Sequence, residues 1–249
     1  MQDNNKQPLL AHLDEIRVRL TKSVIALVVA VVISFPLARY IFPILMEPVS
    51  GVDLYYFDLT GLFSPYIKIC LYLALAISGP YILYQIVMFI TPALKRSEKG
   101  YLYTLLPATI ILFIGGALFC YFVLLPPGLN FLYRTFPQWV GGGIEPMWSV
   151  TDYVSKITQL CFWIGVVFEI PLVMFFLAKI RVISPEWVIR KWKWAVVLAF
   201  VLGAFITPTP DPLNQTLVAA PILVLYGLGC VLAKIARPGM PLRSRKSKS

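Results

Sequence analysis

The sequence contains few charged residues for its length. Aspartate, glutamate, lysine and arginine make up 14% of the 249 residues, whereas soluble domains contain about a quarter. Hydrophobic residues make up 59% and the mean hydropathy is +0.77, so a water-soluble fold could not cover its own surface. The composition excludes a soluble enzyme, a disordered tail and a disulfide scaffold. It predicts an integral membrane protein.

Residues that bind metals or form catalytic sites are also scarce. His12 is the only histidine, and none of the cysteines forms a C-x-x-C pair. All four cysteines lie inside apolar runs, where they act as small hydrophobic residues: Cys70, Cys120, Cys161 and Cys230. The P-loop and the G-x-S-x-G nucleophile motif are missing as well. We therefore expect no metal, no cofactor and no enzymatic activity, neither ATP hydrolysis nor intramembrane hydrolysis.

Apolar runs divide the chain into six predicted spans, since about 20 apolar residues cross a bilayer. The spans cover 23–37 with a weaker continuation to 45, 69–90, 105–125, 157–180, 195–206 and 216–233. Prolines between the last two cannot continue a helix, so we expect a short hairpin there. We predict an all-α integral membrane protein with one six-span domain over 1–249. A cytoplasmic amphipathic helix at 1–22 and a basic tail at 237–249 are its expected appendages.

The basic residues are distributed unequally between the two sides of these spans. Eighteen of the 22 lysines and arginines lie before the first span, after the sixth, or in the segments joining spans two to three and four to five. Because basic residues remain in the cytoplasm, both termini are predicted to be cytoplasmic. The net charge of +10 is then an insertion signal, and we expect contact with membrane lipid but not with nucleic acid.

Two acidic residues are candidates for a binding site on this basic side. Glu15 lies in an amphipathic stretch at 9–20 and can pair with Arg19 one helical turn later. Glu98 is the only acid in the loop 95–99. A surface helix and an exposed ion pair would explain both residues adequately. Alternatively, two fixed carboxylates that each accept two parallel hydrogen bonds would suit a ligand with two adjacent arginines.

Glu169 lies near the middle of the fourth predicted span, which is otherwise an uninterrupted apolar run. A carboxylate at the bilayer centre costs about 2.5–3.5 kcal/mol, so it should face protein or water. It either bonds to a neighbouring helix or contacts a partner or cargo. An alternative function is a small secondary transporter that uses Glu169 as a proton or substrate site, although the internal repeat common in such carriers is missing.

Polar residues and prolines mark the remaining candidate positions. Asp211 can cap the sixth helix, whereas Gln215 could hydrogen-bond a partner helix. Three prolines are interpreted as kink or boundary residues: Pro48, Pro80 and Pro221.

Four short segments follow one another along nearly the whole chain in an order and spacing that are typical of one protein family. They are His12 to Leu20 (HLDEIRVRL), Phe89 to Leu94 (FITPAL) followed by Glu98, Phe168 to Pro171 (FEIP), and Pro210-Asp211 with Gln215. Together with the six spans, they resemble the TatC subunit of the twin-arginine, or Sec-independent, protein translocase. Before the sixth span the family's Thr-Pro-Pro-Asp is one residue longer here.

The resemblance implies a signal-peptide receptor and core translocase component for folded proteins, driven by the proton-motive force in a prokaryotic plasma membrane. It implies that Glu169 lines a concave face. It further implies that the last two spans, with Asp211 and Gln215, contact the single-span partners TatA and TatB, and that the subunit self-associates in a receptor complex. The residues implied in binding twin-arginine signal peptides are Glu15, Arg17, Phe89, Leu94 and Glu98.

Overall fold

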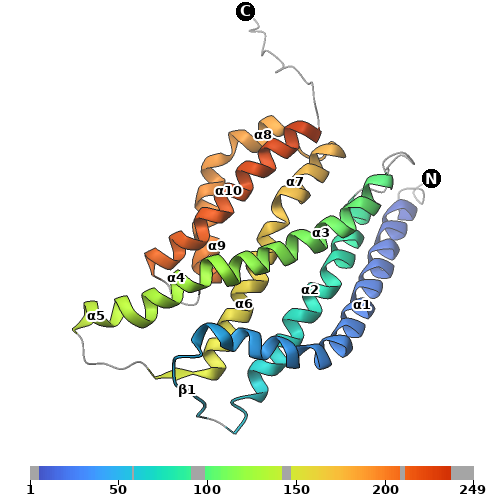
Figure 1. Ribbon diagram of the computed structural model, residues 1–249. Helices are drawn as coiled ribbons and strands as arrows, with labels where there is room; N and C mark the ends of the chain where they lie inside the picture. The colour runs from blue at the N-terminus through green and yellow to red at the C-terminus, as the bar shows by residue number, and fades with distance from the viewer. Residues whose placement is uncertain (1–5, 58, 91–98, 142–146, 208–210, 237–249) are drawn as a thin grey trace, which may run out of the picture.

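The computed structural model describes residues 6–57, 59–90, 99–141, 147–207 and 211–236. These residues form helices that run back and forth along one bundle (Figure 1). The main helices are α1 (Lys6–Met46), α2 (Phe63–Ile90), α3 (Lys99–Phe119), α6 (Val150–Phe168), α7 (Ile170–Lys179), α9 (Trp192–Ile206) and α10 (Pro212–Ala236). Shorter elements are the 3-10 turn η1 (Glu47–Val49), the π-helical turns η2 (Cys120–Leu124) and η3 (Phe131–Thr135), and the helices α4 (Leu125–Asn130), α5 (Phe136–Val140) and α8 (Pro185–Arg190).

Within these described ranges, five helical stretches are long and apolar enough to cross a bilayer, and α9 is a sixth, shorter apolar helix. The first residues of α1 and the last residues of α10 lie at the same end of the bundle, which we call the terminal end (Figure 1). The two-residue strands β1 (Leu54–Tyr55) and β2 (Trp148–Ser149) pair in parallel at the opposite end. The predicted fold class, an all-helical multi-pass membrane protein, is confirmed.

Several helices extend beyond the apolar runs that predicted them. α1 is continuous from Lys6 to Met46, so the amphipathic stretch at 9–20 and the first span form one helix. The third pass continues from α3 through η2 into α4. Pro126 and Pro127 lie in the first turn of α4, directly after the π-helical turn η2, and the backbone stays helical through them. Pro212 is the first residue of α10, where a missing N–H leaves no intrahelical bond unmade.

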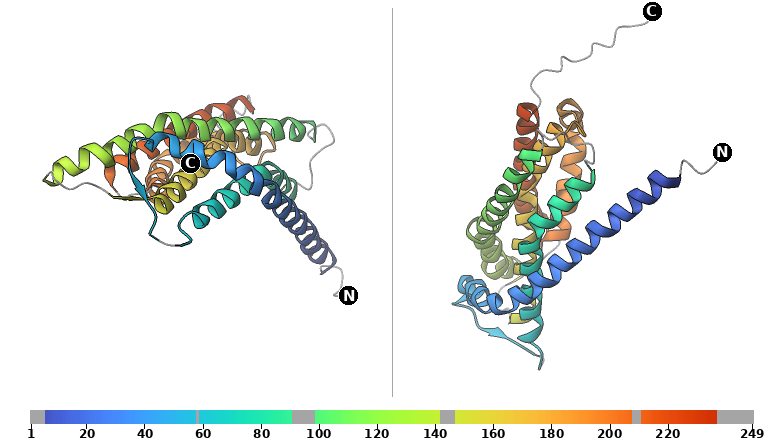
Figure 2. Two further views of the ribbon diagram at one scale, coloured as in Figure 1. Left: turned by 60° about the horizontal axis from the view of Figure 1, so that its bottom comes forward. Right: turned by 90° about the vertical axis from the view of Figure 1, so that its right-hand side faces the viewer.

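The helices pack in two groups joined by a crossing. α1 packs along α2, while α7, α9 and α10 pack together on the other side (Figure 1). α6 contacts both groups, and α3 crosses it. The right-hand view of Figure 2 shows that α1 leans away from the other helices at the terminal end.

Two glycines allow α3 and α6 to approach closely where they cross. A Cβ atom on Gly116 would lie 2.8 Å from Cγ of Phe168 and 2.9 Å from the Cα of Gly165. A Cβ on Gly165 would lie 2.7 Å from Cε2 of Phe113. Small residues at helix crossings permit this close packing in membrane proteins.

The fourth pass differs from its prediction. The predicted span at 157–180 lies almost entirely within one stretch that is long and apolar enough to cross a bilayer, Val150–Lys179, but this stretch contains two helices, because α6 ends at Phe168 and α7 begins at Ile170, with Glu169 between them. Pro171 causes the break, since it has no N–H to donate to the carbonyl of Val167. The chain tightens instead, and the N–H of Glu169 donates to the carbonyl oxygen of Val166 at 3.1 Å. Glu169 consequently lies at a helix junction.

Arg181 follows α7 in a left-handed conformation with φ of 65°. Its neighbour Val182 donates a backbone hydrogen bond to the Leu177 carbonyl at 2.9 Å, a helix-ending motif that favours glycine at the preceding position. We expect Arg181→Gly to stabilise the protein by about 1 kcal/mol, because glycine adopts this conformation without a Cβ penalty. Arg181→Ala is the control, since it removes the same charge but keeps the Cβ. Thermal unfolding in detergent measures both, and equal melting temperatures would contradict the expectation.

Candidate functional site

A polar network links α1 and α2 towards the terminal end. The guanidinium of Arg19 donates from Nε at 3.0 Å and from Nη2 at 2.6 Å to the same carboxylate oxygen, Oε1 of Glu15. Its third nitrogen, Nη1, donates to Oε1 of Gln85 at 3.3 Å. The amide of Gln85 in turn donates to the hydroxyl of Tyr81 at 2.7 Å. Four side chains from two helices thus form one network, in which Arg19 binds both Glu15 and Gln85.

The network is only partly shielded from solvent. The side chain of Glu15 is 33% exposed and that of Arg19 is 21% exposed, while Gln85 is buried. The i,i+4 pairing of Glu15 with Arg19 was predicted and is confirmed. The part played by Gln85 was missed, and its only signal was a lone amide near the end of an apolar span. The site presents a half-exposed carboxylate that already binds a guanidinium group.

The remaining predicted signal-peptide residues are distributed around this network. Arg17 lies exposed on α1, and Phe89 is half-buried in the last turn of α2. Leu94 and Glu98 lie outside the described residues, so the expected proximity of Glu98 to Glu15 stays a prediction. α2 ends at Ile90 and α3 begins at Lys99, both at the terminal end (Figure 1).

Glu169 faces a cavity of about 470 Å³ inside the helical bundle. Its carboxylate oxygen Oε2 is buried and has no hydrogen-bond partner among the residues that the structure describes. The walls are apolar apart from this carboxyl and the Thr109 side chain, and they come from α2, α3, α6 and α7. The lining residues include Ala76, Pro80, Leu83, Phe113, Val166, Ile170 and Met174. A carboxyl without a partner in such a hollow is an acceptor for a polar group on a ligand or helix that enters it.

The hairpin of α9 and α10 is held by its own polar groups. Asp211 caps α10, accepting at Oδ2 the backbone N–H of Asn214 at 2.8 Å, as predicted. The amide nitrogen of Gln215 donates to the carbonyl of Phe200 on α9 at 2.9 Å. The amide nitrogen that could reach a partner helix is therefore bonded inside the hairpin, and a contact of Gln215 with a partner stays a prediction.

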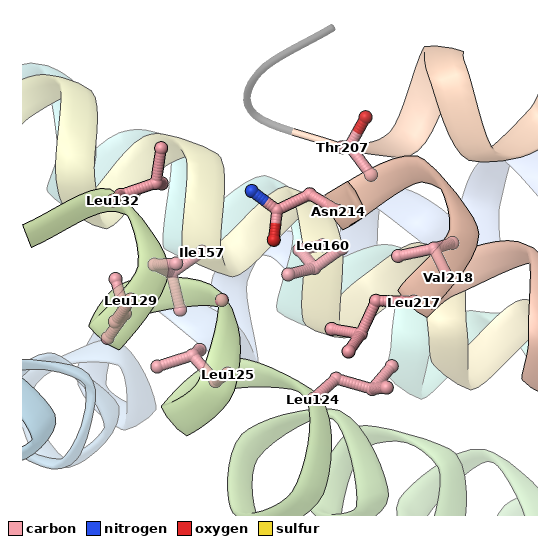
Figure 3. Close-up of a pocket in the computed structure, with 11 residues that line it drawn as sticks. Leu124, Leu125, Leu129, Leu132, Ile157, Leu160, Thr207, Asn214, Leu217 and Val218 are labelled. Atoms are coloured by element: carbon pink, nitrogen blue, oxygen red, sulfur yellow. The ribbon is translucent and has the colours of Figure 1, made fainter. Parts of the chain in front are cut away.

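Figure 3 shows how this hairpin meets the third pass. Leucines from η2, α4 and the following turn surround a small cavity of about 30 Å³, with Ile157 and Leu160 from α6 and Asn214 and Val218 from α10. Thr207 lines the same cavity, and its hydroxyl oxygen is buried without a hydrogen-bond partner among the described residues. The end of the hairpin where α9 turns into α10 therefore packs against the third pass and α6.

The predicted boundary prolines occupy different structural positions. Pro48 lies in η1, directly after α1 ends, whereas Pro80 and Pro221 lie inside α2 and α10. Pro80 also lines the cavity of Glu169. In the described part of the chain, no three histidine, cysteine, aspartate or glutamate side chains gather as metal ligands would.

Comparison with known proteins adds a family to this geometry. Residues 11–221 match the family described as TatC, Sec-independent protein translocase protein. A TatC protein of Aquifex aeolicus is 41% identical over 234 residues, covering 92% of this chain and 95% of the relative. One of Carboxydothermus hydrogenoformans is 33% identical over 238 residues, covering 95% and 96%. A chloroplastic TATC of Pisum sativum is 32% identical over 236 residues, covering 94% of this chain and 66% of the relative.

A solved structure has the same fold as this chain. The crystal structure described as the twin-arginine translocase receptor TatC superposes with a TM-score of 0.78 at 40% sequence identity, covering 90% of this chain and 99% of the other.

Proposed function

Because the chain belongs to the TatC family of twin-arginine translocase receptor components, we propose that its terminal end binds the paired arginines of signal peptides on folded proteins. Glu15 and Glu98 accept the two guanidinium groups, and Arg17, Phe89 and Leu94 line the path of the peptide. A carboxylate binds a guanidinium through parallel hydrogen bonds, a geometry that lysine cannot reproduce.

One observation carries this proposal. Glu15 is a half-exposed carboxylate that binds a guanidinium group in this structure, through two nitrogens of Arg19. Its neighbour Gln85 provides a second acceptor for the same guanidinium at 3.3 Å. The residues around Glu15 therefore supply the chemistry that an arginine-bearing peptide requires.

The other polar positions support partner contacts in the same proposal. The Glu169 cavity receives a polar group of the cargo or of a single-span partner, and the α9–α10 hairpin with Asp211 and Gln215 contacts TatA and TatB. Such contacts would also relieve the hydrophobic mismatch of α9, since this helix is about 22 Å long and the bilayer hydrocarbon is roughly 30 Å thick. The protein self-associates in a receptor complex in a prokaryotic plasma membrane, with both termini in the cytoplasm, and the proton-motive force drives transport.

Binding of a synthetic twin-arginine peptide to the purified full chain in detergent tests the proposal. We expect the peptide to bind more tightly than its twin-lysine counterpart. Glu15→Gln combined with Glu98→Gln should weaken twin-arginine binding by more than about 100-fold, because two charge-assisted hydrogen bonds are lost and each contributes about 1.5–3 kcal/mol. Isothermal titration calorimetry measures the dissociation constants.

The matched control removes acids that the proposal does not use. Asp14 is exposed and precedes Glu15 on the same helix, and Glu186 lies in the first turn of α8. Asp14→Asn combined with Glu186→Gln removes the same total charge and should change the affinity less than about twofold. Unchanged binding of the twin-arginine peptide to the Glu15 and Glu98 double variant would contradict the proposal.

A further inference from the structure

The carboxylate of Glu15 already has a guanidinium ligand in this structure, and that ligand belongs to the chain itself. We propose that Arg19 is an internal placeholder: its guanidinium occupies Glu15 when no peptide is bound, and an arginine of the incoming peptide displaces it. This inference rests on the proposed function, and it concerns how that site is regulated.

The geometry places Arg19 in competition with any external arginine. Both of its donors to Glu15, Nε and Nη2, converge on the single oxygen Oε1, at 3.0 and 2.6 Å. A peptide guanidinium that binds a carboxylate bidentately needs both oxygens. It can therefore engage Glu15 fully only if Arg19 leaves Oε1.

Arg19 has a second contact that it can keep when it leaves Glu15. Nη1 donates to Gln85 on α2 at 3.3 Å, and Gln85 is fixed by its own hydrogen bond to Tyr81. The Arg19 side chain is also 21% exposed, so its released nitrogens can be hydrated. Displacement thus leaves no charged group buried without a partner, so the free-energy cost of the exchange is small.

The exchange also favours arginine in the peptide. When one guanidinium replaces another on Glu15, one charge-assisted contact through two guanidinium nitrogens is broken and another is formed. A peptide lysine would replace this two-donor contact by a point charge, so its interaction with Glu15 is weaker than the Arg19 interaction that it displaces. The placeholder consequently lowers the affinity for every cationic peptide and keeps weak ligands out of the unoccupied receptor.

Removing the placeholder should tighten peptide binding. For a half-exposed ion pair we expect Arg19→Gln to lower the dissociation constant of a twin-arginine peptide by about two- to fivefold. Arg19→Lys keeps the charge but donates from one nitrogen instead of two, so it should produce a smaller decrease in the same direction. Lys22→Gln is the charge-matched control, because Lys22 is exposed on the same helix and forms no ion pair with the described residues.

Isothermal titration of the full chain in detergent at one fixed salt concentration distinguishes the outcomes. Tighter binding in both Arg19 variants, beyond any change in Lys22→Gln, supports the placeholder. Weaker binding in the Arg19 variants would mean that Arg19 only positions Glu15, and an effect equal to that of Lys22→Gln would mean general repulsion. Either result overturns the inference.

Two further measurements keep the test decisive. Thermal unfolding shows whether Arg19→Gln remains folded, and if it does not, the charge-conserving Arg19→Lys alone decides the outcome. If wild-type protein fails to prefer twin-arginine over twin-lysine peptide, the proposed function itself fails. A preference that persists without any tightening in the Arg19 variants rejects only the placeholder.

Discussion

Gly116→Ala is expected to destabilise the protein strongly, whereas Gly115→Ala, one residue earlier, is not. A Cβ on Gly116 would lie 2.8 Å from Phe168 and 2.9 Å from the backbone of Gly165, while a Cβ on Gly115 has no atom within 4 Å. Overpacking a close crossing costs about 1–3 kcal/mol, and backbone cannot rotate away as a side-chain tip can. Both substitutions gain the same helix propensity, about 1 kcal/mol, so the difference between them isolates the clash.

Thermal unfolding in detergent should show a melting temperature about 5–10 °C lower for Gly116→Ala than for Gly115→Ala. Gly165→Ala provides an independent check of the same crossing. Its new Cβ would meet the ring of Phe113 at 2.7 Å, a side chain that can be shortened. Phe113→Leu should therefore rescue Gly165→Ala but not Gly116→Ala. Equal melting temperatures for the Gly115 and Gly116 variants would contradict the close packing of α3 on α6.

The crossing also determines the shape of the Glu169 cavity. Phe113, which packs on Gly165, lines this cavity together with Val166. Phe168, which packs on Gly116, directly precedes Glu169. The glycines therefore fix the wall against which the buried carboxyl lies. Partial defects in transport by folded Gly116 variants would follow from this connection.

The passes of the chain could be predicted because each is a local apolar run. The residues at which the helices begin and end could not be predicted from these runs. A proline inside a helix kinks or breaks it, whereas a proline in the first turn is tolerated, and Pro126 and Pro212 both lie in first turns. The π-helical turns η2 and η3 were not predicted, although η2 is followed by Pro126 and Pro127, which have no N–H to continue α-helical hydrogen bonds. Pro171 causes the break at Glu169 and is evident in the sequence, but the break was not predicted because the apolar run continues on both sides of it.

The candidate site was predictable only where its partners lie close in sequence. Glu15 and Arg19 are four residues apart on one helix, and a spacing rule was sufficient. Gln85 is 66 residues from Arg19, and only the packing of α2 on α1 brings them together. Gln215 was interpreted as a residue that could bond a partner helix, and its hydrogen bond to the carbonyl of Phe200 was missed, because it depends on α9 folding back against α10. Long-range pairs of this kind require the tertiary structure.

Glu169→Ala is expected to abolish most transport while leaving twin-arginine peptide binding unchanged. The carboxyl lies in an apolar cavity of about 470 Å³, and its Oε2 has no hydrogen-bond partner among the described residues, so it is available to an entering group. Leaving the entering polar group without its acceptor in such a site costs about 1–3 kcal/mol and should lower the transport rate by about 5- to 150-fold. Export of a folded reporter with a twin-arginine signal into membrane vesicles, with TatA and TatB present, measures the rate.

Two control variants separate the carboxyl from the cavity. Val166→Ala enlarges the same hollow without removing a polar group, and it should transport at near the wild-type rate. Glu169→Gln keeps an acceptor oxygen of the same size but not the acid, so its rate shows whether hydrogen bonding alone is sufficient. Because Glu169 lies at the α6–α7 junction and Glu15 near the start of α1, peptide affinity should be unaffected in all three variants. Loss of peptide binding in Glu169→Ala with TatA and TatB assembly intact would reverse the assignment, and would place the recognition of the signal peptide inside the bundle.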